Sequence, residues 1–417
     1  MIFKNLKIFD WKQFNNLNID FHPQLTVLTG ANGSGKTTIL NILAKHFGWN
    51  LNELSTPVLN KSTGAFTFSF SLLKKLTFVP AYNSQGYIIG SLTYSSDTET
   101  QLIALDQPAA QYYVQIVNQQ QVRGLNIPSH RPVFFYEPVV NISTQKRTKE
   151  HAYQLTFQNS VSKFQAQYGQ SKSANFYIKE TLLSWAIGGA GNEFIQPDNE
   201  IRDYYLGFQR ILKVLLPKTL GFQSIAIRNY EIILETETGD FMLDAVSGGL
   251  SAIIDLGWQI YNFSKDSTEK VSVLIDEVEN HLHATMQREI LPNLIDAFPN
   301  IQFIVSTHSP LIIGSVKDSF VHAFRYDDSK KIYNEKLDLE NKAKSATEIL
   351  NEVLGVPFTM PIWVENSLNS IINKYAELEL NQNIFNEMRE DMKELGLENL
   401  MPLALDKTIQ KRNDSNS

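Results

Sequence analysis

Apolar residues along this chain repeat at two different spacings, and the spacing changes from segment to segment. Residues 25–29 form a short apolar run that predicts a buried strand. Apolar residues then recur at helical spacing from Ile39 until Gly48, a glycine that suits a helix C-cap. Farther along, residues 248–262 predict a helix and residues 271–275 a buried strand. The pattern therefore predicts strand and helix units in two distant parts of the chain.

The segments around these units are patterned differently. Residues 62–125 contain short strand-like runs separated by turn residues, whereas residues 145–218 lose this alternation and favour helices. Strand patterns return from Gly221. After about residue 340 the chain is charged and helical, and the polar residues 411–417 predict a disordered tail.

A glycine-rich sequence lies between the first predicted buried strand and the helix that follows it. Residues 30–37 read Gly-Ala-Asn-Gly-Ser-Gly-Lys-Thr, which matches the phosphate-loop pattern G-x-x-x-x-G-K-[ST]. Glycines allow backbone N–H groups to surround phosphates, the lysine reaches the β- and γ-phosphates, and the threonine hydroxyl can bind Mg²⁺. We therefore expect a nucleoside triphosphate to bind here. The residues expected to bind it are Gly30, Asn32, Gly33, Ser34, Gly35, Lys36, Thr37 and Thr38.

An acidic pair follows the second predicted buried strand. Asp276 and Glu277 come directly after residues 271–275, which is the Walker B pattern. Together with a phosphate loop, this pattern predicts that Asp276 and Thr37 hold Mg²⁺ and that Glu277 polarises the water that attacks the γ-phosphate. His308 follows the next apolar run, at the edge where the carboxyl ends of parallel strands meet. We expect it to contact the γ-phosphate or to hold the attacking water.

A second candidate anion site opens the helix predicted at residues 248–262. Ser247, Gly248 and Gly249 offer a hydroxyl, backbone N–H groups and a helix N-terminus. Because the chain has one phosphate loop, this site needs a partner subunit, whose γ-phosphate it could cap.

Taken in order, these motifs resemble the ABC-type ATPase head. Along the chain they come in this order: the phosphate loop, the Ser-Gly-Gly signature, Walker B with a following glutamate, and the histidine. Residues 6–33 and residues 276–283 (Asp-Glu-Val-Glu-Asn-His-Leu-His) resemble the soluble RecF/SMC and OLD-like branch of AAA ATPases rather than transporters. Two positions depart from the family pattern: Val278 stands where proline is frequent, and Leu250 stands where an acidic residue or glutamine is usual.

The resemblance implies the fold, the ligands and the assembly. It implies an α/β fold class, with a P-loop ATPase head built on a mixed sheet, an inserted strand and helical lobe, and a helical C-terminal segment. It also implies that ATP and Mg²⁺ lie between two heads, so that Ser247, Gly248 and Gly249 act in trans in a head-to-head dimer or higher homo-oligomer. The domains expected are residues 1–60 for the first part of the head, 61–239 for the inserted lobe, 240–330 for the second part of the head, and 331–417 for the helical segment with its disordered tail.

Two further segments resemble a narrower group. Residues 346–357 resemble the ATPase subunits of bacterial anti-phage systems, such as the Septu, retron-associated and PARIS ATPases. Residues 129–132, Ser-His-Arg-Pro, resemble a segment that lies near the nucleotide in these ATPases. Arg131 either senses phosphate or lies in a surface loop, and the sequence favours neither.

Composition narrows the class of protein. A chain of 417 residues is expected to form two or three lobes, and the absence of cysteine excludes disulfides, cysteine zinc sites and thiol nucleophiles. The net charge of −7 gives no support for a large basic groove, although nucleic acid stays open as a partner. The sequence contains no apolar run of the length that spans a membrane, so we expect a cytoplasmic protein with no membrane partner.

The leading hypothesis is an ABC-type ATP hydrolase that serves as the sensor and scaffold subunit of an anti-phage defence complex. It would hold a toxic effector, expected to be a nuclease encoded nearby, and release or activate it after a phage-derived trigger. The sequence shows no intrinsic nuclease site. The alternative is a RecF-like ATPase that binds DNA ends in repair, which predicts salt-dependent DNA binding stimulated by ATP.

Overall fold

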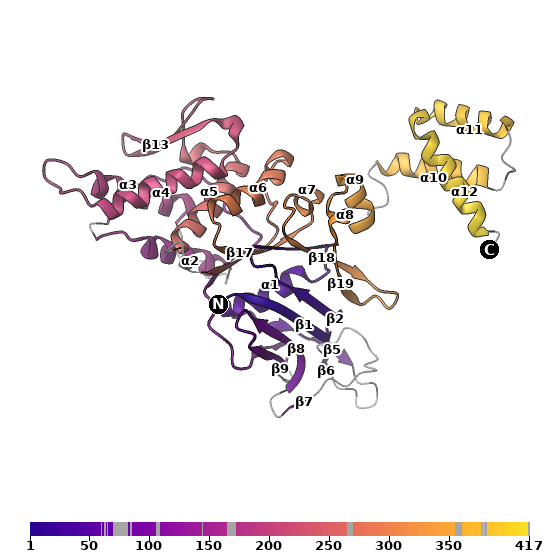
Figure 1. The fold of residues 1–417 in the computed structure, drawn as a ribbon, viewed down its shortest axis with the longest axis horizontal. Helices are drawn as coiled ribbons and strands as arrows, with labels where there is room; N and C mark the ends of the chain where they lie inside the picture. The colour runs from indigo at the N-terminus through magenta and orange to yellow at the C-terminus, as the bar shows by residue number, and fades with distance from the viewer. Residues whose placement is uncertain are drawn as a thin grey trace. The chain divides into compact units, whose positions relative to one another are not determined.

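The computed structural model describes most of the chain. The described residues are 1–59, 61, 64, 66–69, 82–83, 86–105, 109–143, 145–164, 172–264, 270–354, 361–376, 378 and 382–415. The chain divides into two compact units, Met1–Ala346 and Thr347–Ser417 (Figure 1).

A mixed sheet forms the centre of the first unit. Twelve strands belong to it among the described residues. Across the sheet the order is β11 (Val114–Ile116), β9 (Glu99–Leu105), β8 (Gly86–Tyr94), β1 (Phe3–Trp11), β2 (Phe14–Asp20), β19 (Ile332–Lys336), β18 (Phe320–Tyr326), β3 (Leu25–Gly30), β17 (Ile301–Thr307), β16 (Val271–Ile275) and β12 (Gly124–Ile127), with β7 (Tyr82–Asn83) beside β8.

The part of the sheet that matters for the site is parallel. The pairs β18–β3, β3–β17, β17–β16 and β16–β12 are parallel, and every residue of β3, β16, β17 and β12 is buried. Continuous apolar runs are expected for parallel strands that are covered on both faces. The carboxyl ends of these strands share one edge, which brings the segments after β3, β12, β16 and β17 together.

The other part of the sheet is antiparallel and draws on the segment expected to form the inserted lobe. Strand β8 pairs with β1, β9 pairs with β8, and β11 pairs with β9. Strands β8, β9 and β11, like β12, therefore share the sheet of the ATPase head. Shorter strands nearby are β4 (Glu53–Leu54), which pairs with β10 (Gln111–Tyr112), and β5 (Thr56–Leu59), which pairs with β6 (Phe66–Ser69).

Helix α1 (Lys36–Ala44) continues through a 3₁₀ turn (Lys45–Phe47) and ends at Gly48, whose φ of 83° is the left-handed conformation of a glycine C-cap. Its residues Ile39, Leu40, Ile42 and Leu43 are buried in the core beneath the antiparallel strands. That core also contains Trp11, Phe14 and Phe21.

A group of helices packs beside the parallel strands. It comprises α2 (Lys149–Phe164), α3 (Ala174–Ala190), α4 (Asn199–Leu215) and α5 (Gly248–Phe263). Figure 1 shows α3, α4 and α5 side by side, and buried aromatic rings join them: the Trp185 and Trp258 centroids lie 5.4 Å apart, and those of Phe208 and Trp258 4.9 Å apart. A small antiparallel sheet of β13 (Phe222–Arg228), β14 (Glu231–Thr236) and β15 (Phe241–Met242) adjoins this group.

Shorter helices complete the first unit. They are a 3₁₀ turn (Lys218–Leu220), another (Leu243–Ala245), α6 (Ala284–Ala297), α7 (Pro310–Ile313) and α8 (Leu339–Lys342). The short helix α9 (Ala346–Glu348) begins at the last residue of the first unit and continues into the second. The mixed sheet, its helices and the helical C-terminal unit confirm the predicted α/β fold class.

The second unit is helical. It contains a π-helical turn (Ile349–Val353), α10 (Ile362–Ala376), α11 (Gln382–Glu394), a 3₁₀ turn (Glu398–Leu400) and α12 (Met401–Ser415), around a core that includes Leu368, Tyr375, Met388 and Met392. Composition predicted a disordered tail from residue 411, but α12 continues to Ser415. Met401, Ala404 and Thr408 are buried in the first part of this helix, and its polar end extends the same helix. None of the described helices is long and apolar enough to cross a membrane.

Candidate functional site

The phosphate loop follows β3 and leads into α1. Gly30 has φ 142°, Gly33 78° and Gly35 84°, backbone conformations that side-chain-bearing residues rarely adopt. A Cβ atom on Gly30 would lie 2.6 Å from the carbonyl oxygen of Phe324, and one on Gly35 would overlap the Phe14 ring. The loop can therefore curl as it does only with glycine at these positions.

Lys36 is the buried cation of this loop. Its side chain is 5% exposed, and Nζ donates to the carbonyl oxygens of Gly30 at 3.0 Å and Ala31 at 3.1 Å. Burial lowers the pKa of Lys36 to about 8, and the nearby carboxylates of Asp276, Glu279 and Glu277 oppose this shift. Its charge is thus held inside the loop, close to the acidic residues that follow β16.

Asp276 joins the phosphate loop to the neighbouring strands. Thr37 Oγ1 donates to Asp276 Oδ2 at 2.9 Å, and the Ser306 hydroxyl, on β17, donates to Asp276 Oδ1. A carboxylate and a hydroxyl side by side are the hard oxygen donors that Mg²⁺ prefers, so the residues present fit this ion.

Glu277 is held in an unusual backbone conformation. Its φ is 46°, the left-handed region, which is costly for a residue with a side chain and concentrates at functional sites. Its N–H donates to Ser306 Oγ at 2.8 Å, and its carboxylate accepts a 2.7 Å hydrogen bond from Asn280 Nδ2. Both contacts fix the direction of the carboxylate.

His308 follows β17 directly. Its backbone N–H donates to Glu279 Oε1, so the Walker B segment and the histidine segment are tied together. Burial lowers the pKa of His308, Lys36 lowers it further, and Glu279 and Glu277 oppose them. The imidazole is therefore neutral near pH 7, a form that can both donate and accept a hydrogen bond.

These residues line one cavity of about 220 Å³. The described lining residues are Gln13, Asn32, Gly33, Gly35, Lys36, Thr37, Thr38, Asp276, Glu277 and His308. Nearly all of the predicted nucleotide and catalytic residues are thus brought together. Gly30 and Ser34 lie behind this surface, where Gly30 accepts from Lys36 and Ser34 is fully buried.

The signature residues lie elsewhere. Ser247 is the N-cap of α5, its hydroxyl accepts from the N–H of Leu250 at 3.5 Å, and both Ser247 and Gly248 are exposed. Just before them, Asp244 is buried and binds Lys179 Nζ at 2.9 Å. A buried ion pair therefore fixes the residue that precedes the exposed turn. None of the residues of the turn is among the described lining of the nucleotide cavity.

Two residues of the site were not assigned from the sequence. Gln13, in the turn between β1 and β2, donates to the Gly33 carbonyl oxygen at 3.1 Å and lines the cavity; a lone glutamine between two strands gives no signal of this. Arg131, which the sequence left open, lies in an irregular segment between the exposed His130 and Val133, but its own side chain is buried, with 6% exposed. Its Nη2 donates to the main-chain carbonyl oxygen of Asp276 at 2.9 Å.

Comparison with protein-family models gives two matches. Residues 245–314 match the model described as "AAA domain, putative AbiEii toxin, Type IV TA system", and residues 3–53 match "P-loop containing region of AAA domain". The two matches cover the signature-to-histidine segment and the phosphate loop.

Curated relatives cover most of the chain. A Septu protein PtuA from Bacillus thuringiensis is 22% identical over 88% of this chain and 87% of its own length. The retron Vc95 probable ATPase of Vibrio cholerae is 23% identical over 90% of this chain and 83% of its own. Among solved structures, the SMC head domain from Thermotoga maritima is 14% identical with a TM-score of 0.41, covering 81% of this chain and 100% of that one.

The relatives, the family models and the site agree with the family predicted from the motifs. The chain is similar to ABC-type AAA ATPases, and in particular to the Septu and retron ATPases of bacterial anti-phage defence systems, which supports its activity as an ATP hydrolase.

Proposed function

We propose that this ATPase is the sensor and scaffold subunit of a cytoplasmic anti-phage defence complex. In this proposal, ATP binding closes pairs of heads that hold a toxic effector, a nuclease encoded nearby, and a phage-derived trigger releases or activates it. The observation that carries the proposal is the exposed Ser247-Gly248 turn outside a nucleotide cavity that otherwise holds the hydrolytic groups. The likeness to Septu protein PtuA and to retron ATPases supports the defence role.

Within one head, each residue has a proposed task. Lys36 and the loop N–H groups hold the phosphates of ATP, and Thr37 and Asp276 hold Mg²⁺, which would neutralise phosphate charge. Glu277 orients the attacking water, since its carboxylate is already fixed by Asn280. His308 contacts the γ-phosphate as a neutral imidazole.

In this proposal, the second head supplies the signature residues that contact the γ-phosphate. Ser247, Gly248 and Gly249 offer a hydroxyl and backbone N–H groups at the start of a sixteen-residue helix, and these groups stabilise anions. Placed over the γ-phosphate of a partner, they would make closure depend on ATP. The buried Lys179–Asp244 pair would keep this turn rigid as the heads close.

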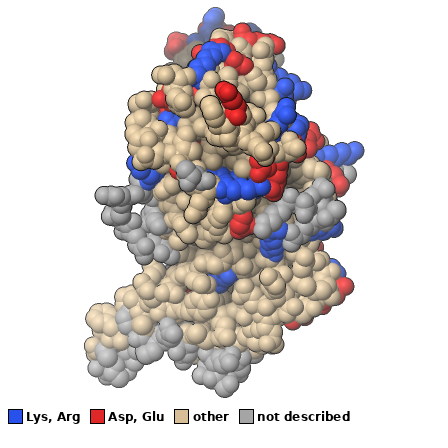
Figure 2. All heavy atoms as spheres, turned by 90° about the vertical axis from the view of Figure 1, so that its left-hand side faces the viewer, with Lys and Arg blue, Asp and Glu red and all other residues tan. Residues whose placement is uncertain are grey.

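The face drawn in Figure 2 bears on the DNA-repair alternative. There, Lys and Arg side chains are interspersed with Asp and Glu and form no continuous basic stripe. A net charge of −7 agrees with this distribution. We therefore keep DNA binding as an outcome of the test rather than as a second proposal.

The test is purification of the tagged chain expressed with its neighbouring genes, followed by light scattering with and without ATP. An ATP-stabilised oligomer that carries a neighbour-encoded nuclease is expected. Lys36→Ala should lose the ATP-dependent assembly, whereas Lys213→Ala, which removes an exposed lysine of α4, should retain it. A lone dimer that binds DNA only with ATP, or an effector bound equally by Lys36→Ala, would contradict the proposal.

A further inference from the structure

The segment that follows β12 presents large apolar side chains to solvent. Residues 128–143, all of which the structure describes, form neither helix nor strand. Val133, Phe135 and Tyr136 are 63%, 57% and 58% exposed. Phe134 is 6% exposed, so it points inward while its two neighbours point outward, as in extended backbone. We call Val133, Phe135 and Tyr136 the apolar strip.

Hydrogen bonds hold the apolar strip in place on the surface. Asn175, near the start of α3, donates from Nδ2 to the carbonyl oxygen of Phe135 at 2.8 Å. The Tyr136 hydroxyl donates to Glu231 Oε1 at 3.2 Å, and Lys179 Nζ lies 5.1 Å from the centre of the Tyr136 ring. The strip is therefore exposed although its position is fixed. Exposed apolar patches of this kind mark interaction sites.

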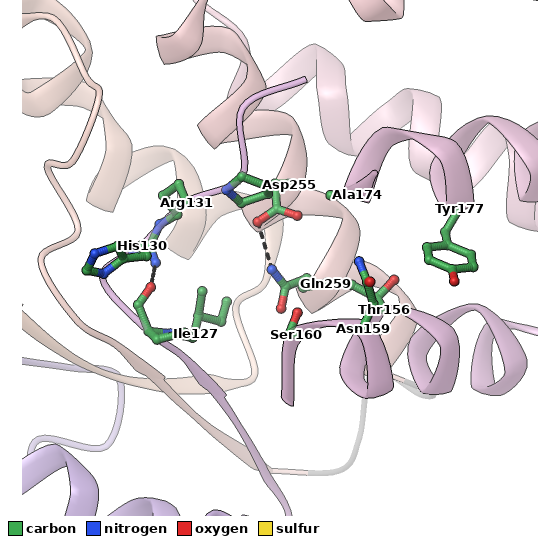
Figure 3. Close-up of a pocket in the computed structure, with 12 residues that line it drawn as sticks. Ile127, His130, Arg131, Thr156, Asn159, Ser160, Ala174, Tyr177, Asp255 and Gln259 are labelled. Carbon is green, nitrogen blue, oxygen red and sulfur yellow. Dashed lines mark hydrogen bonds between the residues drawn. The ribbon is translucent and has the colours of Figure 1, made fainter. Parts of the chain in front are cut away.

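The side chains of the strip do not fill the cavity that the same segment lines. That cavity, of about 460 Å³, is formed by the start of the segment together with α2, α3 and α5. Figure 3 shows His130 at one end of the residues drawn and Tyr177 at the other. The described lining contains Arg131 and Pro132 but none of the three residues of the strip. In the part of the chain that the structure describes, the strip therefore stays open to solvent.

The apolar strip lies beside the signature turn, residues 247–249. Asn175 Nδ2, which binds the carbonyl oxygen of Phe135, also donates to Asp244 Oδ1. Asp244 comes three residues before Ser247, the exposed N-cap of α5. One side chain thus joins the backbone of the strip to the segment that leads into the signature turn.

The segment after β16 joins the same two regions from another side. A Cβ atom on Gly249 would lie 3.1 Å from the carbonyl oxygen of His281, so the signature turn packs closely on this segment. The preceding residue, Asn280, donates from Nδ2 to the carbonyl oxygen of Ser129 at 3.0 Å. Ser129 lies four residues before Val133, at the start of the segment that carries the strip. The strip and the signature turn therefore belong to one continuous surface.

This surface holds its charges in pairs. Lys172 pairs with Glu137 at 2.8 Å, and Lys179 pairs with Asp244 at 2.9 Å. Two copies of a chain with a net charge of −7 repel each other at long range. A contact between copies is therefore favoured where the local charges are already balanced and apolar side chains are exposed.

The signature turn is too small to form an interface alone. Its three residues are one serine and two glycines, whereas a specific interface usually buries at least about 1,000 Å² in total. A two-fold contact uses the same patch on both copies, so each exposed apolar residue beside the turn contributes twice. The apolar strip is placed to supply the area that the turn lacks.

We propose that the apolar strip packs against a second copy of this chain, beside that copy's nucleotide cavity, when two heads close around ATP. This inference rests on the proposed function, because it requires the signature turn to face the γ-phosphate of a partner. Closure would then remove the strip from water, so hydrophobic burial adds to the contact that the turn makes with the phosphate. Phosphate recognition makes closure depend on ATP, and the strip makes the closed pair stable.

The burial of the strip can be measured because the sequence contains no cysteine. Val133→Cys introduces a single thiol with little change in size, and Glu277→Gln in the same chain slows the hydrolysis that would reopen the heads. We expect ATP to slow the reaction of this thiol with a maleimide at least about tenfold, and more strongly at higher protein concentration. Phe194→Cys, at a loop position that is 89% exposed, is the control and should react equally with and without ATP.

A second variant measures what the strip contributes to closure. Phe135→Ser should raise the protein concentration at which half of the chains associate with ATP at least about tenfold, because an aromatic ring is no longer buried. Its ATP affinity at low protein concentration should match the parent, since Phe135 is not among the described lining of the nucleotide cavity. Phe194→Ser makes the same exchange on the exposed loop and should associate as the parent does. Light scattering measures the association.

The outcomes separate this inference from the proposed function. If the heads associate with ATP but Val133→Cys is labelled equally with and without it, the strip is not in the interface and the pairing of heads stands. Protection that does not change with protein concentration would also overturn the inference, because a movement within one head would then cover the strip. Unchanged association of Phe135→Ser would remove its contribution to closure. If ATP produces no association in the parent, both proposals fail.

Discussion

Arg131 donates from Nη2 to the main-chain carbonyl oxygen of Asp276 at 2.9 Å, although the two residues come from segments far apart in the sequence. The contact exists because β12 pairs in parallel with β16, with Ile127 opposite Ile275. Both strands end at the same edge, so the arginine that follows one strand reaches the aspartate that follows the other. Arg131 therefore supports the Walker B segment from the side opposite the phosphate loop.

Removing this support should slow ATP hydrolysis. Arg131→Ala removes the donor from the buried contact to the Asp276 carbonyl oxygen and from the partly buried contact to that of Pro128, which costs about 1–3 kcal/mol. We expect kcat to fall about tenfold, because a loss of about 1.4 kcal/mol in positioning corresponds to that factor. Steady-state ATPase assays and thermal melting check this, with Arg210→Ala on the exposed face of α4 as the control. An Arg131→Ala protein with the wild-type kcat would show that the carbonyl contact has no part in hydrolysis.

Site residues that belong to local motifs could be predicted from the sequence, whereas residues placed by the pairing of distant strands could not. A few adjacent residues are enough to identify the phosphate loop, the acidic pair and the N-cap serine. In the phosphate loop these residues are the glycines, because its backbone requires positive φ. Arg131 could not be decided, since its place depends on β12 joining β16. The same holds for strands β8, β9 and β11, which lie in the segment expected to form the inserted lobe and pair with the sheet of the head. Gln13 reaches the nucleotide cavity only because β1 and β2 turn beside the loop.

Replacing Glu277 by glutamine should separate ATP binding from hydrolysis. The amide keeps the size of the side chain and its hydrogen bond to Asn280, but it is a poor base for orienting water. We expect ATP affinity within about threefold of the wild type and a kcat at least about a hundredfold lower, within the range of contributions from general bases. Single-turnover hydrolysis and nucleotide binding measure the two quantities, and Glu289→Gln, at an exposed position of α6, is the matched control. Wild-type turnover in Glu277→Gln would remove this glutamate from the proposed mechanism.

Mixing two inactive variants should restore activity if the signature works in trans. Lys36→Ala removes phosphate binding in its own head, and Ser247→Arg blocks the exposed turn that would serve the partner's site. A mixed pair contains one intact site, built from the phosphate loop of one chain and the signature of the other. If subunits exchange freely in an equimolar mixture, random pairing at a symmetric interface makes about half of the pairs mixed. Each mixed pair has one intact site of two, so about a quarter of the wild-type number of sites should be active. ATPase rates of each variant alone and of the mixture give the answer, and a mixture as inactive as its parts would place the signature in cis or outside the site.

The buried lysine of the phosphate loop should make ATP binding depend on pH. In the nucleotide-free protein, burial lowers the pKa of Lys36 to about 8, so the side chain is largely charged at pH 7 and largely neutral at pH 9. Phosphate oxygens favour the charged form and raise this pKa in the complex, so ATP binding takes up a proton between the two values. ATP affinity is therefore expected to change little below about pH 7 and to fall by up to about tenfold per pH unit above about pH 8. Titration calorimetry at pH 8 in two buffers of different ionisation enthalpy measures the proton taken up, and Lys36→Arg, which keeps a permanent positive charge, should lose this uptake. Equal proton uptake in Lys36→Arg and the wild type would assign the pH dependence to another group.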